Sequence, residues 1–103
     1  MESFKGQYEW DPAKAKANLG KHKITFETAT KVFDDPNFLL IEDRTDETGE
    51  QRWHAVGTAE GVALLLVVHV YREDENAEQI IRIISARTAD PRERQLYAQQ
   101  AVE

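Results

Sequence analysis

Four arginines gather near the C-terminal end of the chain. They are Arg82, Arg87, Arg92 and Arg94, within the stretch IIRIISARTADPRERQLY. Guanidinium groups are planar, stay charged and match phosphate oxygens with paired hydrogen bonds. Arg92 and Arg94 fall in the first turn of an expected helix, where the helix dipole favours acids over bases. A bound anion would account for basic residues at this position, so the stretch predicts a phosphate site.

A second basic group, Lys21, His22 and Lys23, ends an expected helix near the N-terminus. One interpretation is a further phosphate contact, with His22 as a proton carrier. The other is structural, because the helix dipole by itself favours cations at a C-terminal end. The arginines carry the same ambiguity, since surface arginines commonly pair with carboxylates. Residue types alone leave both interpretations open.

Glu93 and Tyr97 stand beside the C-terminal arginines and also have structural explanations. Glu93 follows Asp90 by three residues, the D-x-x-E arrangement of a helix capping box. Tyr97 follows Arg94 by three residues, and a helix residue of this kind often packs on a sheet. Each could instead act as an acid or base in catalysis.

Metal binding is disfavoured by the sequence. The chain has no cysteine, and its three histidines, His22, His54 and His69, have neither HxH nor HExxH spacing. His69 lies inside an expected core strand. We therefore expect neither a metal site nor a cofactor.

The net charge of -6 does not exclude a nucleic-acid partner, because the acids are unevenly distributed. Residues 34–50 hold seven acids and one arginine, and residues 73–78 hold four acids and no base. Most bases lie outside these blocks, in expected helices and strands. We therefore expect most of the acidic residues to lie in loops.

Length and apolar runs predict one soluble domain spanning residues 1–103. The longest apolar run, Val62 to Val68, is far shorter than the roughly 20 residues of a membrane-spanning helix. The start, MESFKGQYEW, lacks the charged-then-apolar order of a signal peptide. A cytoplasmic location without membrane contact is therefore expected.

Hydrophobic periodicity predicts the elements that must position the basic groups. Asp11 and Pro12 open a helix that continues through Leu19, with Gly20 near its end, and Thr25 caps a second helix. Apolar runs and alternation predict the strands. The expected elements are a strand over 6–10, helices over 12–19 and 26–33, strands over 38–44, 51–59, 62–72 and 79–87, and a helix from about 90 to 101.

The order β-α-α-β-β-β-β-α indicates an α+β fold, with an antiparallel sheet packed against helices. Antiparallel pairing of the last two strands would bring Arg72 near Arg82 and keep it well away from Arg87. Acidic EDENAE forms the hairpin loop between these strands.

Three stretches together resemble the BrnT family of toxins from bacterial type II toxin–antitoxin systems. They are WDPAKAKANLGKHKITFETATKVFDDPN, EDRTDETGEQRWHAVGTAEGVALLLVVHVYR and RIISARTADPRERQLY. The resemblance implies a RelE-like ribonuclease fold and cleavage of mRNA without metal or cofactor, which blocks translation. It also implies a BrnA-type antitoxin with a ribbon-helix-helix domain, a heterotetramer with it, and operator DNA bound only through the antitoxin.

The resemblance also supplies candidate site residues. Those implied as catalytic are Arg72, Arg87, Glu93, Arg94 and Tyr97, and those expected to bind RNA are Lys21, His22, Arg82 and Arg92. Two features depart from the family pattern. Asp90-Pro91 occupies a place that is often polar or basic, and the loop EDENAEQ is longer and more acidic than a minimal turn.

Three functions follow as hypotheses of unequal weight. The leading one is an endoribonuclease toxin, with Glu93, His22 and Tyr97 as unranked candidates for the acid and base. The alternative is a catalytically weak module that holds an antitoxin and supports operon repression, which the net charge and Pro91 favour. A metal-dependent hydrolase would require activity that is sensitive to EDTA.

Overall fold

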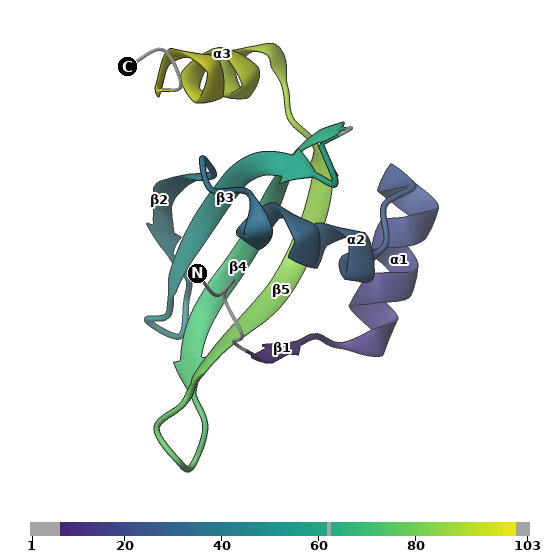
Figure 1. Ribbon diagram of the computed structural model, residues 1–103. Helices are drawn as coiled ribbons and strands as arrows, with labels where there is room; N and C mark the ends of the chain where they lie inside the picture. Colours follow the sequence, from purple (N-terminus) through teal and green to yellow (C-terminus); the bar gives the residue numbers. More distant parts are fainter. Residues whose placement is uncertain (1–6, 62, 101–103) are drawn as a thin grey trace.

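The computed structural model describes residues 7–61 and 63–100. Gly6, Val62 and Ala101, which the expected elements include, lie outside the described residues. The five strands form one sheet in the order β1-β5-β4-β3-β2 (Figure 1). The elements are β1 (Gln7–Glu9), α1 (Pro12–His22), α2 (Phe26–Thr30), the 3-10 helix η1 (Lys31–Asp34), β2 (Leu39–Thr45), β3 (Gln51–Ala59), β4 (Ala63–Glu73), β5 (Gln79–Thr88) and α3 (Pro91–Gln100).

The α+β class is confirmed, but the expectation of a purely antiparallel sheet was wrong. β1 runs parallel to β5, with Glu9 beside Arg82, whereas the other neighbouring strands are antiparallel. A parallel pair requires a long connection, and here most of the chain separates the two strands. Local periodicity predicts that β1 is a strand but carries no information about its distant partner.

Helix α1 begins as expected and ends later. The Asp11 side chain accepts a hydrogen bond from Ala13 N at 2.9 Å, which caps the start. The helix continues three residues past Leu19 to His22, so Gly20 lies near its end as expected, and Lys23 adopts the left-handed conformation (φ 62°) that closes it. Lys21 and His22 therefore lie within the last helical turn.

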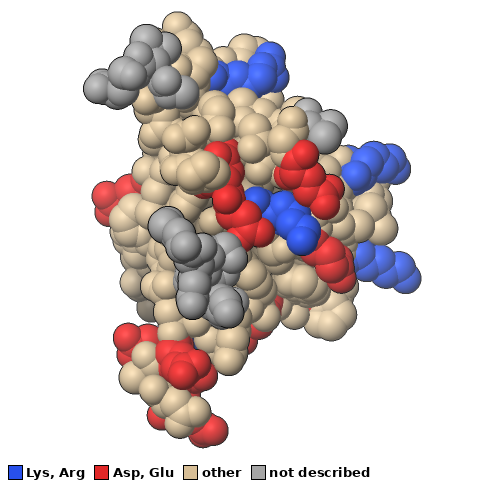
Figure 2. Space-filling model, viewed as in Figure 1, with Lys and Arg blue, Asp and Glu red and all other residues tan. Residues whose placement is uncertain are grey.

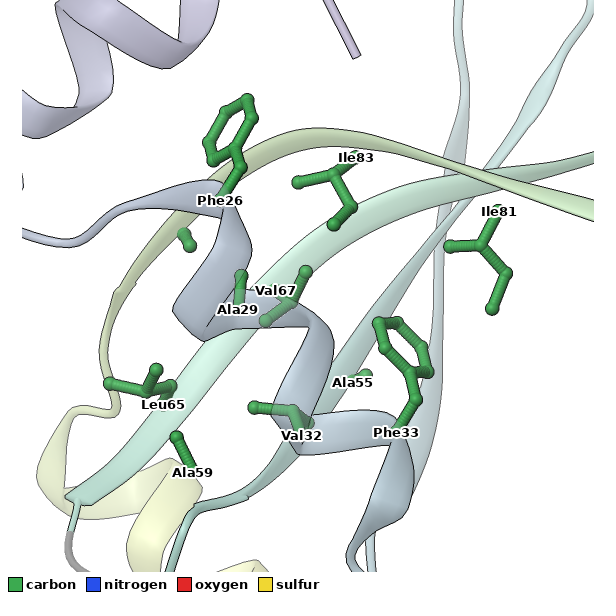
Figure 3. Packing of buried hydrophobic residues seen from close by; sticks show 11 residues of the cluster. Phe26, Ala29, Val32, Phe33, Ala55, Ala59, Leu65, Val67, Ile81 and Ile83 are labelled. Carbon is green, nitrogen blue, oxygen red and sulfur yellow. The ribbon is translucent and has the colours of Figure 1, made fainter. Parts of the chain in front are cut away.

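The sheet face covered by α2 and η1 holds the main core. Phe26, Ala29, Val32 and Phe33 are buried against it, which confirms the apolar face expected from their spacing (Figure 3). The Thr25 hydroxyl caps this segment by accepting from Thr28 N at 3.1 Å. The segment is not one regular helix, because its second half tightens into the 3-10 turn η1.

The opposite face, called the open face below, is packed by α3 at one end. There Tyr97 and Ala89 join a smaller cluster around Val56 and Leu66. Figure 1 shows α3 beyond the end of the sheet, on the side away from the tip of the β4–β5 loop. Farther along, the face carries half-exposed side chains such as that of Val68. None of the described helices is long and apolar enough to cross a membrane.

Close packing of η1 on β3 depends on Gly57. A Cβ at this position would lie 2.9 Å from Phe38 Cβ and 3.1 Å from both Val32 Cγ1 and Asp35 Oδ2. We expect Gly57→Ala to lower the free energy of unfolding by about 1–3 kcal/mol, the usual range for overpacking. Chemical denaturation measures this. Gly20→Ala is the control: its Cβ meets nothing within 4 Å, so stability should stay equal or rise, and equal losses in both would contradict the packing argument.

Candidate nucleic-acid interface

The arginines on β4 and β5 share the open face. Arg82 lies opposite Val70, and Arg87 lies opposite Leu66. Residues two apart along a strand point to the same side, so Leu66, Val70 and Arg72 share one face of β4. Leu66 belongs to the cluster beneath α3, which identifies that side as the open face. The basic side chains therefore lie opposite the main core.

Arg72 and Arg82 meet at one carboxylate. Arg72 Nη1 lies 3.0 Å and Arg82 Nη1 3.1 Å from the same oxygen, Oε2 of Glu9. The side chains of Arg72, Arg82 and Glu9 are 46%, 33% and 31% exposed, so water and solutes reach all three. The expected proximity of Arg72 to Arg82 is confirmed. We call these three residues the Glu9 triad.

Arg87 lies at the far end of the same two strands. The partner of Arg87 on β4 is six residues from Arg72, a separation of about 20 Å along the strand. Arg87 donates two hydrogen bonds to Glu93, at 2.9 and 2.8 Å. This pairing, partly opposed by burial, raises the pKa of Arg87 above its usual value. The bidentate contact joins β5 to the start of α3.

Glu93 also completes the expected capping box. Its carboxylate accepts from Asp90 N at 2.9 Å, and Asp90 Oδ1 accepts from Glu93 N at 2.8 Å. The Glu93 side chain is only 14% exposed. In this structure the anion at the start of α3 is therefore a side chain of the protein itself. Nearby, Arg94 donates to Ala89 O at 2.8 Å, and Arg92 is exposed.

Tyr97 anchors α3 to a buried aspartate that sequence reasoning did not select. The Tyr97 hydroxyl donates to Asp35 Oδ2 at 2.6 Å, and the same oxygen accepts from Thr58 N at 2.9 Å. Burial would raise the pKa of Asp35, but these hydrogen bonds outweigh it and lower the pKa. Burial and the bond to Asp35 raise the pKa of Tyr97. Tyr97 thus retains its proton for a structural contact.

Lys21 and His22 lie beside β5, between the two arginine groups. With Asn18 and Ser85 they line a cleft of about 340 Å³. Asn18 holds α1 in place, because its side-chain amide accepts from Ala86 N at 3.0 Å and donates to Ala86 O at 2.9 Å. Ala86 lies beyond the part of β5 that pairs with β1, so the Asn18 side chain makes the hydrogen bonds to its backbone that a neighbouring strand would otherwise make.

Two further basic side chains on the open face were not selected from the sequence. His54 faces Val68, and its Nε2 lies 3.1 Å from Asp43 Oδ2. Arg52 precedes it by two residues and shares its face. The Nε of Arg52 is buried and has no hydrogen-bond partner within residues 7–61 and 63–100. The alternation in QRWHAV could have identified them. Trp53 is apolar and belongs on the core side of the strand, so Arg52 and His54 on either side of it must point to the opposite face.

Glu9 and Asp35 were missed for different reasons. Glu9 alternates with Tyr8 and Trp10, so its side was predictable, but its arginine partners depend on the parallel β1–β5 pairing. Asp35 belongs to the helix-ending DDPN stretch, and its contact with Tyr97 joins residues 62 positions apart. Local patterns identify neither long-range partner.

The predicted residues do not converge on one small pocket. Arg72 and Arg82 lie toward the β4–β5 loop, Lys21 and His22 lie beside the middle of β5, and the remaining group surrounds α3. The loop itself is acidic, and Figure 2, which views the molecule from the side of α2, shows its carboxylates gathered at the lower tip. An elongated anion such as a polynucleotide suits this distribution better than a small ligand.

No cluster of three or more histidine, aspartate or glutamate side chains suited to a metal ion occurs in the part of the chain that the structure describes. Three acidic side chains of the open face instead contact basic residues. Glu9 and Glu93 contact arginines, and Asp43 contacts His54.

Comparison with known proteins agrees with this architecture. A crystal structure of the ribonuclease toxin BrnT from Brucella abortus matches with a TM-score of 0.61 at 21% sequence identity, covering 82% of this chain and 97% of that one. No curated protein sequence matches the chain. The family model for the ribonuclease toxin BrnT of type II toxin–antitoxin systems matches residues 10–93. The chain therefore belongs to the BrnT family of ribonuclease toxins.

Proposed function

We propose that this protein is a single-domain, metal-independent endoribonuclease of RelE-like fold, which cleaves mRNA in the cytoplasm and thereby inhibits translation. The observation that supports it most directly is the pair Arg72 and Arg82, side by side and accessible on the open face. Further bases continue from this pair along β5 toward α3. RNA lies along this line, with the scissile phosphate at the Glu9 triad.

The chemistry needs no metal ion if charged side chains stabilise the phosphate. The 2′-oxygen forms a bond to phosphorus while the bond from phosphorus to the 5′-oxygen breaks, which leaves a cyclic phosphate. A base takes the 2′-hydroxyl proton, and an acid protonates the departing 5′-oxygen. Arg72 and Arg82 supply hydrogen bonds to the phosphate oxygens, whose negative charge increases in the transition state.

The group around α3 has a supporting role in this proposal. Arg87 and Arg94 contact RNA beyond the scissile phosphate, and exposed Arg92 adds electrostatic attraction. Glu93 and Tyr97 hold Arg87 and α3 in position, because their polar groups already have intramolecular partners. Lys21 and His22 contact the RNA between the two arginine groups, which places His22 beside a neighbouring phosphate and not at the one that is cleaved.

The proposed protein partner is a BrnA-type antitoxin with a ribbon-helix-helix domain. The two chains assemble as a heterotetramer, and operator DNA is bound only through the antitoxin. The open face suits such a partner because half-exposed Ile41, Val68 and Ile84 lie among the basic side chains. An acidic, amphipathic segment covering this face would exclude RNA.

Cleavage of a single-stranded RNA in excess EDTA tests the enzymatic proposal. We expect unchanged cleavage after metal removal, with products ending in a cyclic phosphate, because arginines perform the charge stabilisation. Induction of the protein alone in bacteria should arrest growth. Activity that EDTA abolishes and a divalent metal ion restores would contradict metal independence.

A binding module without efficient catalysis is the second candidate function. It is favoured by the intramolecular pairing of Glu93 and Tyr97, which gives both groups a structural role in holding α3. Such a protein would bind the antitoxin tightly, cause no growth arrest at an expression level confirmed by blot, and leave RNA intact. That combination of results would replace the enzymatic proposal.

A further inference from the structure

In the Glu9 triad, one carboxylate oxygen forms ion pairs with two arginines. We propose that Glu9 is a positioning residue, which holds Arg72 and Arg82 side by side so that together they can bind one phosphate. The inference rests on the proposed ribonuclease function and assigns a role to a residue of that same site.

The fold places Glu9 for this purpose. Arg72 and Arg82 project from antiparallel neighbours, and Glu9 lies directly beside Arg82 on parallel β1. Two guanidinium groups this close repel each other, and long flexible side chains would otherwise move apart in water. A carboxylate between them offsets the repulsion and restricts both side chains. Because each guanidinium has five N–H donors, most remain available to a phosphate.

Two roles of Glu9, positioning the arginines or blocking the phosphate site, predict different effects of removing its charge. If Glu9 merely occupied the place of a phosphate, its removal would improve RNA binding and cleavage together. If it positions the arginines, its removal adds net positive charge, which preserves or strengthens binding, but loses the preorganised geometry on which the cleavage rate depends. The kcat should then fall, while binding stays equal or becomes tighter.

Glu9→Gln tests the proposal, with Glu73→Gln as the matched control. Both substitutions remove one negative charge, and Glu73 follows Arg72 on β4, but consecutive strand residues point to opposite faces, so Glu73→Gln leaves the Glu9 triad in place. For Glu9→Gln we expect kcat to fall about 10- to 100-fold, while the Kd for an uncleavable 2′-deoxy oligonucleotide stays equal or decreases. The control should show a Kd and a kcat close to those of the wild type, because Glu73 lies on the other face of β4.

A second measurement is independent of cleavage. NMR relaxation of the arginine Nε–H groups should report ordered side chains for Arg72 and Arg82 in the wild type and in Glu73→Gln, and mobile ones in Glu9→Gln. Equal order in all three proteins, or a Glu9→Gln enzyme as fast as its control, would overturn the positioning role. If the wild type cleaves no RNA, the ribonuclease proposal fails, and relaxation still decides whether Glu9 orders the arginines.

Discussion

Arg82→Ala should reduce kcat/KM for RNA cleavage by about 100- to 1,000-fold, the range seen when one preorganised donor to a transition-state anion is removed. Arg82 lies at the centre of the proposed phosphate site, next to Glu9 and one strand from Arg72. Deleting its guanidinium removes donors that strengthen their hydrogen bonds as charge develops on the phosphate. Initial rates on a labelled RNA, measured below and above KM, separate lost binding from lost catalysis.

The fold should tolerate this substitution. The Arg82–Glu9 pair is partly exposed, and ion pairs in such positions stabilise a protein by at most about 1 kcal/mol. Arg44→Ala provides the control, because it removes the same charge from exposed β2 at the other side of the sheet. We expect Arg44→Ala to cleave RNA at nearly the wild-type rate. If Arg82→Ala remains as active as this control, the proposed location of the reaction centre is wrong, and the α3 end of the open face becomes the candidate.

The α3 end was the more conspicuous feature of the sequence, yet the structure gives its residues more internal partners. The capping box could be predicted because Asp90 and Glu93 are close in sequence and follow a local rule. The Arg87–Glu93 contact is almost as local. The triad depends instead on β1 crossing to pair with β5, so the proposed centre includes a residue, Glu9, that no local pattern connects to an arginine.

For the fold, too, local interactions could be predicted from the sequence and interactions between distant segments could not. Hydrophobic spacing identified the buried side of α2 and η1, and the apolar run of β4 indicated a central strand. The parallel edge strand, the Asn18 contact with β5 and the Asp35–Tyr97 bond all link distant segments. In each case the partner lies far away in the sequence and is determined by the tertiary structure. Rules of strand alternation and helix capping describe only neighbouring residues and cannot identify such a partner.

Charge distribution resolves the apparent conflict between an acidic chain and an RNA substrate. Electrostatic attraction acts over about 10 Å at ordinary salt concentrations, so local charge matters more than the total. The acidic β4–β5 loop projects from one end of the sheet, and the basic side chains follow β5 away from it. The loop would repel an RNA strand that extended past the triad in that direction, which favours binding toward α3.

Acidification should destabilise the protein through His69. This side chain is fully buried on β4, with its ring 4.8 Å from that of Phe33 and 4.9 Å from that of Tyr71, measured between centroids. Its Nδ1 lies 3.2 Å from Val67 O, and because a carbonyl oxygen only accepts, Nδ1 carries the hydrogen. Nε2 is buried without a hydrogen-bond partner among the described residues. Protonation would thus place an unpaired charge in the apolar core.

Burial lowers the pKa of His69 from 6.5 to about 4 in the folded protein, against the smaller opposing effect of the bond to Val67. Between these values the unfolded chain binds a proton that the folded protein does not, so stability is present above pH 6.5 and decreases toward pH 4. From about pH 7.5 to about pH 5, this residue should lower the free energy of unfolding by roughly 2 kcal/mol.

Urea denaturation of the wild type and of His69→Leu at both pH values measures this contribution. The substitution changes packing, so the informative quantity is the difference between the two pH values within each protein, in which the packing cost cancels. The wild type should lose roughly 2 kcal/mol more than His69→Leu on acidification. Carboxylates with lowered pKa values, such as Asp35 and Asp43, contribute little to either difference, because the stability they provide is lost only as the pH falls through their ordinary pKa of 3.8. Parallel pH dependences would mean that the core accommodates a charged His69, which its contacts with Phe33 and Tyr71 argue against.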